Sequence, residues 1–311
     1  MPDARNDAQF SFTQLHIDVA RNSTDDFNLF HDPGKWQRIR SNPFGGPIAL
    51  GFQLECLVEE RLRLHRETHD EIEMLRQHGL RFSNYQFSFA SVVKPNEAIQ
   101  VEIKKSQFKT GETPQLSNRV VVRNQQGIVL IGHKKESQAP LFLADTDLST
   151  LPELTHLPDR SYVPSTELFC KRKFMNTGNA KNFLCGSLAD QAAWFDVLAE
   201  RVRFPEMFPA ALISCALLER AFKLEHDFEK EPMVYTSHNI SLDRELAQNL
   251  KSNDILHLLV SPEGEITADK GLGGAGVSQY LHRCYGILQG GAVLFRAEIS
   301  MAPLQAILGG D

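Results

Sequence analysis

The sequence has few cysteines, no surplus of basic residues and no long apolar run, and each absence excludes a class of protein. Its 5 cysteines are odd in number and show no CxxC spacing, so neither a disulfide framework nor a zinc site is indicated. The net charge of -6 and a pI near 6.0 argue against nucleic-acid binding, which usually requires a basic surplus. No run of about 18 apolar residues, the length needed to cross a membrane, occurs. We therefore expect no metal, no nucleic-acid partner and no membrane association.

The start of the chain does not have the form of a signal peptide. It reads MPDARNDAQFSF, which is polar and acidic where a signal peptide would be basic and then apolar. The unpaired cysteines are typical of a reducing compartment. We therefore expect a cytoplasmic location. A length of 311 residues with 42% apolar content is enough for one large domain or two of ordinary size.

Residues 1–137 predict one compact unit. Residues 10–19 alternate apolar and polar side chains, as a half-buried strand does. Pro47 can open a helix, because a proline at the first helical position loses no hydrogen bond, and residues 48–67 then predict a long buried helix. Four strand-like segments follow, at 84–93, 97–108, 118–127 and 128–137.

The same order of elements returns in residues 165–311. The intervening segment, 138–164, contains four prolines and little periodicity, which is typical of a linker on the surface. After it the sequence predicts a strand at 165–175, a helix at 208–226, and strands at 233–242, 254–264, 277–288 and 290–301. Two copies of one unit indicate duplication and fusion into a pseudo-dimer within one chain.

The clearest functional signal is the order of groups in STDDFNLFH (23–31) and GGPIALGFQL (45–54). An acid and a histidine, Asp26 and His31, stand five residues apart in an expected loop, and a glycine pair and the buried helix follow. Each has a structural alternative. Asp26 could cap a turn, with His31 on the surface of that turn, and Gly51 could be a packing point for another segment of backbone.

This stretch resembles the MaoC-like (R)-specific enoyl-CoA hydratases and dehydratases. In that family the loop reads roughly S-G-D-x-N-P-x-H, and a glycine follows at the start of a helix. Ser23, Asp26, Asn28 and His31 stand at this spacing, and Gly51 supplies the helix glycine. The resemblance implies an α+β double hot-dog fold, in which each of two repeats wraps an antiparallel sheet around a long central helix. It also implies a hydro-lyase that acts on an acyl-CoA or acyl carrier protein thioester without a cofactor.

Hydration of an enoyl thioester assigns a role to each group. The reaction needs an activated water, a proton for Cα and a hydrogen-bond donor to the thioester oxygen. We expect Asp26 and His31 to hold and activate the water. We expect the backbone N–H of Gly51, aided by the helix dipole, to donate to the thioester oxygen. The residues expected to contact or admit the substrate are Asn28, Gly45, Gly46 and Phe52.

Two other functions remain open. SHNISLDREL (237–246) and the strands after it resemble the C-terminal hot-dog of TesB-type acyl-CoA thioesterases, whose catalytic aspartate falls at Asp243. A non-catalytic thioester-binding subunit is the other alternative. The second repeat has NTGNAKNFLCGS (176–187) where we expect the counterpart of the Asp/His loop, and no such pair is present. We therefore expect the second repeat to form the wall of the substrate tunnel, and a homodimer of pseudo-dimers is a further option.

Two other patterns indicate no site. GLGGAG (271–276) matches a dinucleotide-binding pattern, but a strand-like segment rather than a helix follows it, so we expect a hairpin loop. His65 and His69 lie one helical turn apart, and His78 follows, without any supporting HExxH motif or nearby cysteine. A solvated helix face is the expected arrangement.

Overall fold

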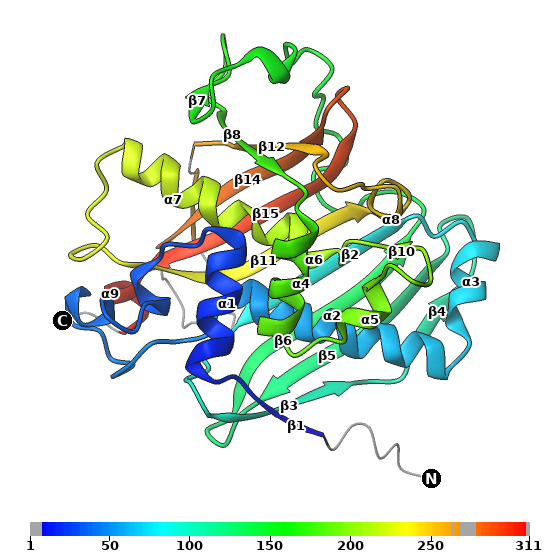
Figure 1. Cartoon of the computed structure of the whole chain (residues 1–311), viewed down its shortest axis with the longest axis horizontal. Helices are drawn as coiled ribbons and strands as arrows, with labels where there is room; N and C mark the ends of the chain where they lie inside the picture. The colour runs from blue at the N-terminus through cyan, green and yellow to red at the C-terminus, as the bar shows by residue number, and fades with distance from the viewer. Residues whose placement is uncertain (1–7, 263, 268–277, 309–311) are drawn as a thin grey trace.

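The first repeat wraps six strands around a long helix. A computed structural model of the chain describes residues 8–262, 264–267 and 278–308 (Figure 1). In the first repeat the elements are β1 (Gln9–Ser11), α1 (Gln14–Thr24), the 3₁₀ helices η1 (Leu29–His31) and η2 (Trp36–Arg38), α2 (Gly51–Thr68), α3 (Glu71–Gln77), β2 (Phe82–Phe89), β3 (Ala98–Ile103), β4 (Gln107–Lys109), β5 (Gln115–Arg123) and β6 (Ile128–Ser137).

The second repeat has the same order with a divided central helix. A connecting segment carries η3 (Leu154–His156) and β7 (Ser161–Tyr162). The elements that follow are β8 (Phe169–Phe174), α4 (Thr177–Gly186), α5 (Gln191–Trp194), β9 (Phe195–Asp196), β10 (Arg201–Val202), α6 (Met207–Ala211), α7 (Ile213–Lys223), β11 (Met233–Asp243), α8 (Arg244–Gln248), β12 (Ile255–Val260), β13 (Gly264–Thr267), β14 (Ser278–Leu288), β15 (Val293–Pro303) and α9 (Leu304–Ile307).

One antiparallel sheet joins the two repeats. Its strand order is β1-β3-β5-β6-β2-β11-β15-β14-β12-β8-β7, with β4 paired to β5 and β13 paired to β14. From the centre outward, β2-β6-β5-β3 in the first repeat matches β11-β15-β14-β12 in the second. The two repeats meet where β2 pairs with β11, in a register from Ser237 opposite Ser88 to Asp243 opposite Phe82. The structure thus confirms the predicted α+β double hot-dog fold.

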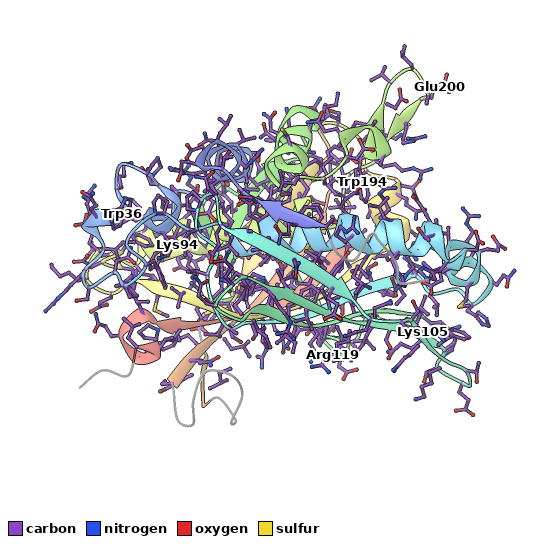
Figure 2. The ribbon with its side chains drawn as sticks, turned by 90° about the horizontal axis from the view of Figure 1, so that it is seen from below. Trp36, Lys94, Lys105, Arg119, Trp194 and Glu200 are labelled. Atoms are coloured by element: carbon purple, nitrogen blue, oxygen red, sulfur yellow. The ribbon has the colours of Figure 1, made fainter. Side chains whose placement is uncertain are left out.

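The helices α1, α2 and α4 lie together on one side of this sheet (Figures 1 and 2). Helix α2 is buried along most of its length, and α1 packs beside α4 of the other repeat. The hairpin of β9 and β10, with Glu200 near its tip, stands away from the sheet (Figure 2). The main apolar core includes residues from both repeats, for example Leu57 on α2 and Phe208 on α6. The two repeats therefore share one core.

The prediction of a strand over residues 10–19 is wrong, because a helix begins within it. Thr13 caps α1: its Oγ1 accepts from the N–H of His16 at 3.4 Å, and its own N–H donates to Nδ1 of His16 at 3.0 Å. The buried positions of α1 include Ile17 and Ala20, three residues apart as on one face of a helix. The alternation in this stretch was therefore coincidental.

The expectation that Pro47 opens the central helix is also wrong, since α2 begins at Gly51. The N–H of Ile48 donates to the carbonyl of Phe30 at 3.0 Å, and that of Ala49 donates to Val93 at 2.8 Å. These bonds hold residues 48–50 outside the helix. They also bring the chain before α2 against η1, which carries His31.

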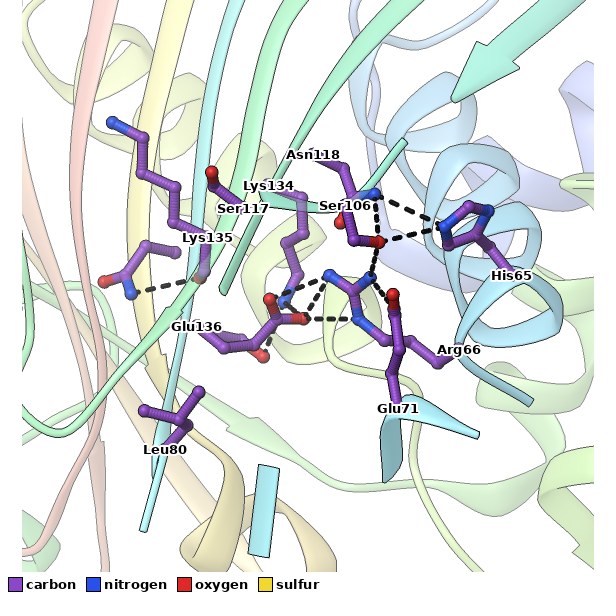
Figure 3. A network of polar contacts seen from close by, with 12 residues as sticks. His65, Arg66, Glu71, Leu80, Ser106, Ser117, Asn118, Lys134, Lys135 and Glu136 are labelled. Atoms are coloured by element: carbon purple, nitrogen blue, oxygen red, sulfur yellow. Dashed lines mark hydrogen bonds and ion pairs between the residues drawn. The ribbon is translucent and has the colours of Figure 1, made fainter. Parts of the chain in front are cut away.

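A buried ionic network fixes the far end of α2 to the sheet (Figure 3). Arg66 on α2 donates to Glu136 on β6 at 2.9 Å and to Glu71 at 2.5 Å. Lys134 lies 3.3 Å from the same carboxylate of Glu136. Burial opposes ionisation of Glu136, but Lys134 and Arg66 outweigh it and lower its pKa to about 2. The network therefore keeps its charges paired and sets the position of α2.

Candidate active site

Asp26 lies just after the end of α1, in the motif loop, which comprises residues 25–31. Asp25 caps the helix in the left-handed region with φ 54°, and the N–H of Asp26 donates to the carbonyl of Arg21 at 2.9 Å. Oδ1 of Asp26 accepts from the N–H of Asn28 at 3.0 Å, which shapes the loop. Oδ2 lies 3.9 Å from Nε2 of His31, and the two side chains are 3% and 7% exposed. The structure thus brings Asp26 and His31 together at a nearly enclosed site.

The segment before α2 fixes the imidazole of His31. Nδ1 of His31 lies 2.8 Å from the carbonyl oxygen of Ile48. A carbonyl oxygen can only accept a hydrogen bond, so Nδ1 carries the proton in the neutral ring and Nε2 presents a lone pair toward Asp26. Asn28 contributes through its side-chain oxygen, which accepts from the N–H of Phe30 at 3.2 Å and caps η1. It therefore shapes the loop that carries the pair.

Gly51 occupies the first position of α2, where backbone N–H groups lack helical partners. The N–H of Leu54 bonds to the carbonyl of Leu50 at 3.2 Å, so the N–H groups of residues 51–53 precede the first bond of this kind. Gln53 anchors the helix start, because its Nε2 donates to the carbonyl of Gly186 on α4 at 2.6 Å. A Cβ atom on Gly51 would lie 3.0 Å from Cζ of Phe89. Glycine is therefore the residue that fits without displacing a neighbour.

A cavity of about 770 Å³ lies between the motif loop and the second repeat. Asn28 and Phe30 line it from the first repeat, and α7, the segment 224–232 and the ends of β11 and β15 line it from the second. Its apolar lining includes Leu217, Leu218, Ala221, Met233, Met301 and Leu304, and Lys230 and Glu231 also line it. The volume and the mixed lining are typical of a site for a small organic molecule.

Tyr235 links this cavity to the Asp/His pair. It lines the cavity from β11, and its hydroxyl lies 3.0 Å from Oγ of Ser214 on α7. Burial raises the pKa of Tyr235, and the negative charge of Asp26 raises it further. The phenol therefore stays neutral near the carboxylate. No local sequence pattern indicates Tyr235, because the pairing of β11 with β2 is what brings this part of the second repeat to the first.

The other expected substrate residues lie in different surroundings. Gly45 and Gly46 belong to a turn before α2, and a Cβ atom on either would have no atom within 4 Å. Phe52 is fully buried and stacks on the imidazole of His238 with ring centroids 4.4 Å apart. Phe52 therefore packs in the core under the helix start, and the glycine pair lies in open surroundings.

Asp243, the residue of the thioesterase alternative, caps a helix. Its Oδ1 accepts from the N–H groups of Glu245 and Leu246 at 3.1 and 3.2 Å. Its Oδ2 accepts from Nε and Nη2 of Arg81 at 2.9 and 2.6 Å. Both carboxylate oxygens thus have structural partners, and Asp243 ends β11, whereas Met233 and Tyr235 line the cavity from its start.

The sequence predicts the counterpart of the motif loop at residues 176–187. The structure corrects this, because the counterpart in the second repeat follows α4. Residues 176–187 are mostly α4, the partner of α1. The segment after it begins Ser187, Leu188, Ala189, Asp190. Oδ1 of Asp190 accepts from the N–H two residues later, that of Ala192, at 2.9 Å, just as Asp26 accepts from Asn28. Five residues after Asp190 stands Phe195, so this turn keeps its aspartate but has no histidine.

The described residues hold no group of three or more His, Cys, Asp and Glu side chains that could bind a metal ion. The imidazole rings of His65 and His69 stack on each other with centroids 4.1 Å apart. The glycine-rich segment 271–276 lies outside the described residues. Within the described ranges, no helix combines the length and apolar character needed to span a bilayer.

The fold and the site define a double hot-dog protein with one Asp/His loop at the junction of its repeats. No family model and no curated protein matches the sequence. Solved structures share the fold. A MaoC-like dehydratase from Phytophthora capsici is 11% identical, with a TM-score of 0.53 and coverage of 94% of this chain and 93% of that chain.

Two further solved structures have the same architecture. A MaoC domain protein from Chloroflexus aurantiacus is 10% identical, with a TM-score of 0.58 over 96% of this chain and 93% of that chain. A conserved protein of Mycobacterium tuberculosis with a double hot-dog fold is 11% identical, with a TM-score of 0.56 over 95% and 93% of the two chains. The chain is thus similar in fold to MaoC-like dehydratases along nearly its whole length.

Proposed function

We propose that this protein is a hydro-lyase that adds water to, or removes it from, the 2,3 position of an acyl thioester. The observation that carries the proposal is the facing pair formed by Oδ2 of Asp26 and Nε2 of His31, 3.9 Å apart. With Nδ1 protonated against Ile48, both facing atoms are acceptors. A water about 2.8 Å from each would give one proton to each and direct an oxygen lone pair into the site.

The proposal assigns a group to each step of the reaction. The water oxygen bonds to Cβ of the enoyl group while one of its protons passes to the Asp26 and His31 pair. The electron pair of the double bond moves toward Cα and the thioester oxygen, and the Asp26 and His31 pair then returns the proton it took to Cα of the resulting enolate. The N–H of Gly51 donates to the thioester oxygen as its negative charge develops. Dehydration is the same sequence in reverse.

The cavity suits the acyl group of such a substrate. Its apolar side chains come mainly from α7, β11 and β15 of the second repeat, while Asn28 and Phe30 lie at the motif loop. The second repeat therefore serves as the wall that holds the acyl chain. Coenzyme A or acyl carrier protein as the carrier, the cytoplasmic location and the homodimer stay predictions.

Hydration of crotonyl-CoA and longer enoyl-CoAs tests the proposal, with loss of absorbance of the conjugated enoyl group as the signal. We expect turnover, and we expect Asp26→Asn to reduce it by at least about 100-fold, the scale for loss of a positioned acid or base. The matched control is Asp190→Asn, because Asp190 makes the same turn in the second repeat without a histidine. Equal turnover in both variants, or release of free thiol without hydration, would overturn the proposal.

A further inference from the structure

A second acid and histidine pair lies under the start of α2. Nδ1 of His238, on β11, is 3.1 Å from both Oε1 and Oε2 of Glu55, on α2. Both side chains are 0% exposed. Three aromatic rings surround the imidazole. The ring of Phe52 stacks on it with centroids 4.4 Å apart, and the rings of Tyr235 and Phe89 meet it edge to face with centroid distances of 4.6 and 4.9 Å. The pair joins the two repeats across the pseudo-dimer junction.

The other ring nitrogen of His238, Nε2, takes no part in this pair. Among the described residues, Nε2 of His238 is buried and has no hydrogen-bond partner. A buried polar atom without a partner lowers the stability of the fold, because it has lost its hydrogen bonds to water and gained none. Buried polar groups normally find a partner, so such an atom calls for a specific explanation. An apolar side chain would fill the aromatic surroundings of His238 without this cost.

The position of His238 indicates what the missing partner is. A Cβ atom on Gly51 would lie 3.6 Å from Cε1 of His238, and Nε2 is bonded to Cε1. Nδ1 is directed to Glu55, one helical turn beyond Gly51. The Cε1 atom of the imidazole therefore faces the start of α2, and Nε2 is the next atom of the ring. Tyr235, which touches the imidazole, also lines the cavity.

We propose that His238, held by Glu55, is a second hydrogen-bond donor to the thioester carbonyl oxygen of the substrate, beside the N–H of Gly51. This inference rests on the proposed function, which places that oxygen at the start of α2. Two donors at one oxygen form the arrangement that stabilises a developing enolate. His238 is then a catalytic residue that the second repeat contributes to the site of the first.

Glu55 makes the donor role consistent with the hydrogen bonds. Its carboxylate can only accept, so Nδ1 of His238 carries a proton. For Nε2 to donate as well, the imidazole must be an imidazolium, and the adjacent Glu55 carboxylate compensates its charge. A buried charge is tolerated when it is paired and hydrogen-bonded. The Nε2–H then has one acceptor to find, which the substrate supplies.

The test removes the donor without leaving a buried carboxylate unpaired. In the double variant His238→Phe, Glu55→Gln, an aromatic ring keeps the packing and the neutral amide removes the charge. We expect kcat for an enoyl thioester to fall roughly 100-fold to 1,000-fold, the scale for losing one donor to an oxyanion, with a much smaller change in KM. The control His257→Phe changes another buried histidine, on β12, and should keep wild-type kcat.

Infrared spectroscopy gives a readout that a structural role would not move. The probe is butyryl-CoA with a ¹³C-labelled thioester carbonyl, which binds but has no double bond to hydrate. We expect its carbonyl stretch to lie at lower frequency on the wild type than on the double variant, because a hydrogen bond weakens the C=O bond. Asp26→Asn should keep the wild-type frequency.

The outcomes separate the two proposals. An unchanged kcat and carbonyl frequency in a folded double variant would overturn the role of His238, while loss of hydration in Asp26→Asn would still support the hydro-lyase. Absence of hydration in the wild type would instead overturn the proposed function. If the double variant does not fold, Glu55→Gln alone decides: it should raise the carbonyl frequency and lower kcat, and wild-type values for both would reject the proposal.

Discussion

Nδ1 of His31 donates to the carbonyl oxygen of Ile48 at 2.8 Å, and this bond decides what the other ring nitrogen can do. With the proton held on Nδ1, Nε2 is an acceptor that faces the carboxylate of Asp26. A position partly enclosed by two acceptors favours a water molecule, which has two protons to donate. The geometry of the loop and of the segment before α2 is therefore consistent with the proposed role of holding a nucleophilic water.

His31→Ala should therefore reduce turnover of an enoyl thioester by at least about 100-fold, since a positioned base contributes on that scale. The fold should stay intact, because His31 lies in a short 3₁₀ helix beside the core. Steady-state kinetics with circular dichroism checks this. His156→Ala, a change at an exposed histidine of η3, is the control. Wild-type turnover in the His31 variant would contradict its role.

Gly51→Val should abolish turnover while the protein still folds. A Cβ atom at this position already meets Cζ of Phe89 at 3.0 Å, so the branched side chain must shift Phe89 or the helix start, where the thioester oxygen is expected. Gly264→Val is the matched control, because a Cβ atom on Gly264 would have no atom within 4 Å. Kinetics and thermal unfolding of both variants test this. An active, well-folded Gly51 variant would refute the oxyanion role of its N–H.

The fold and the loop could be predicted from the sequence because their signals are local. The spacing from Asp26 to His31 and the apolar run after Gly51 are each contained within a short window. The prediction of a strand at 10–19 was wrong, because alternating side chains and a capped helix have similar sequences over one helical turn. The capping box of Thr13 and His16 favours the helix. His238 and Tyr235 could not be assigned, because their positions depend on the pairing of β11 with β2, a long-range contact.

Asp243→Ala should lower stability and leave chemistry nearly unchanged. It removes the cap of α8 and the acceptor of two bonds from Arg81, with an expected cost of roughly 1–3 kcal/mol in the free energy of unfolding. Urea unfolding measures the cost, and kcat at saturating enoyl thioester tests the chemistry. Asp147→Ala, which removes an exposed aspartate that bonds to the N–H of Ser149, should change neither. Lost turnover with unchanged stability would favour the thioesterase alternative.

Glu59 should make the protein less stable as pH rises from about 5 to 8. Burial and the charge of Glu206 raise the pKa of Glu59 to about 8, against about 4.3 for a glutamic acid in an unfolded chain. In this window the folded state holds a proton that the unfolded state has released, so the free energy of unfolding falls as pH rises. Glu59→Gln cannot ionise and should flatten this slope in urea unfolding at several pH values.

The matched control for Glu59 is its neighbour Glu60, which pairs with Arg63 on the same helix at 2.7 Å. Glu60→Gln leaves the carboxyl of Glu59 at the start of α6, where it accepts from the N–H groups of Glu206 and Met207 at 2.7 and 2.9 Å. Its slope should therefore match the wild type. If Glu59→Gln also kept the wild-type slope, another group would have to carry the proton that the folded state retains.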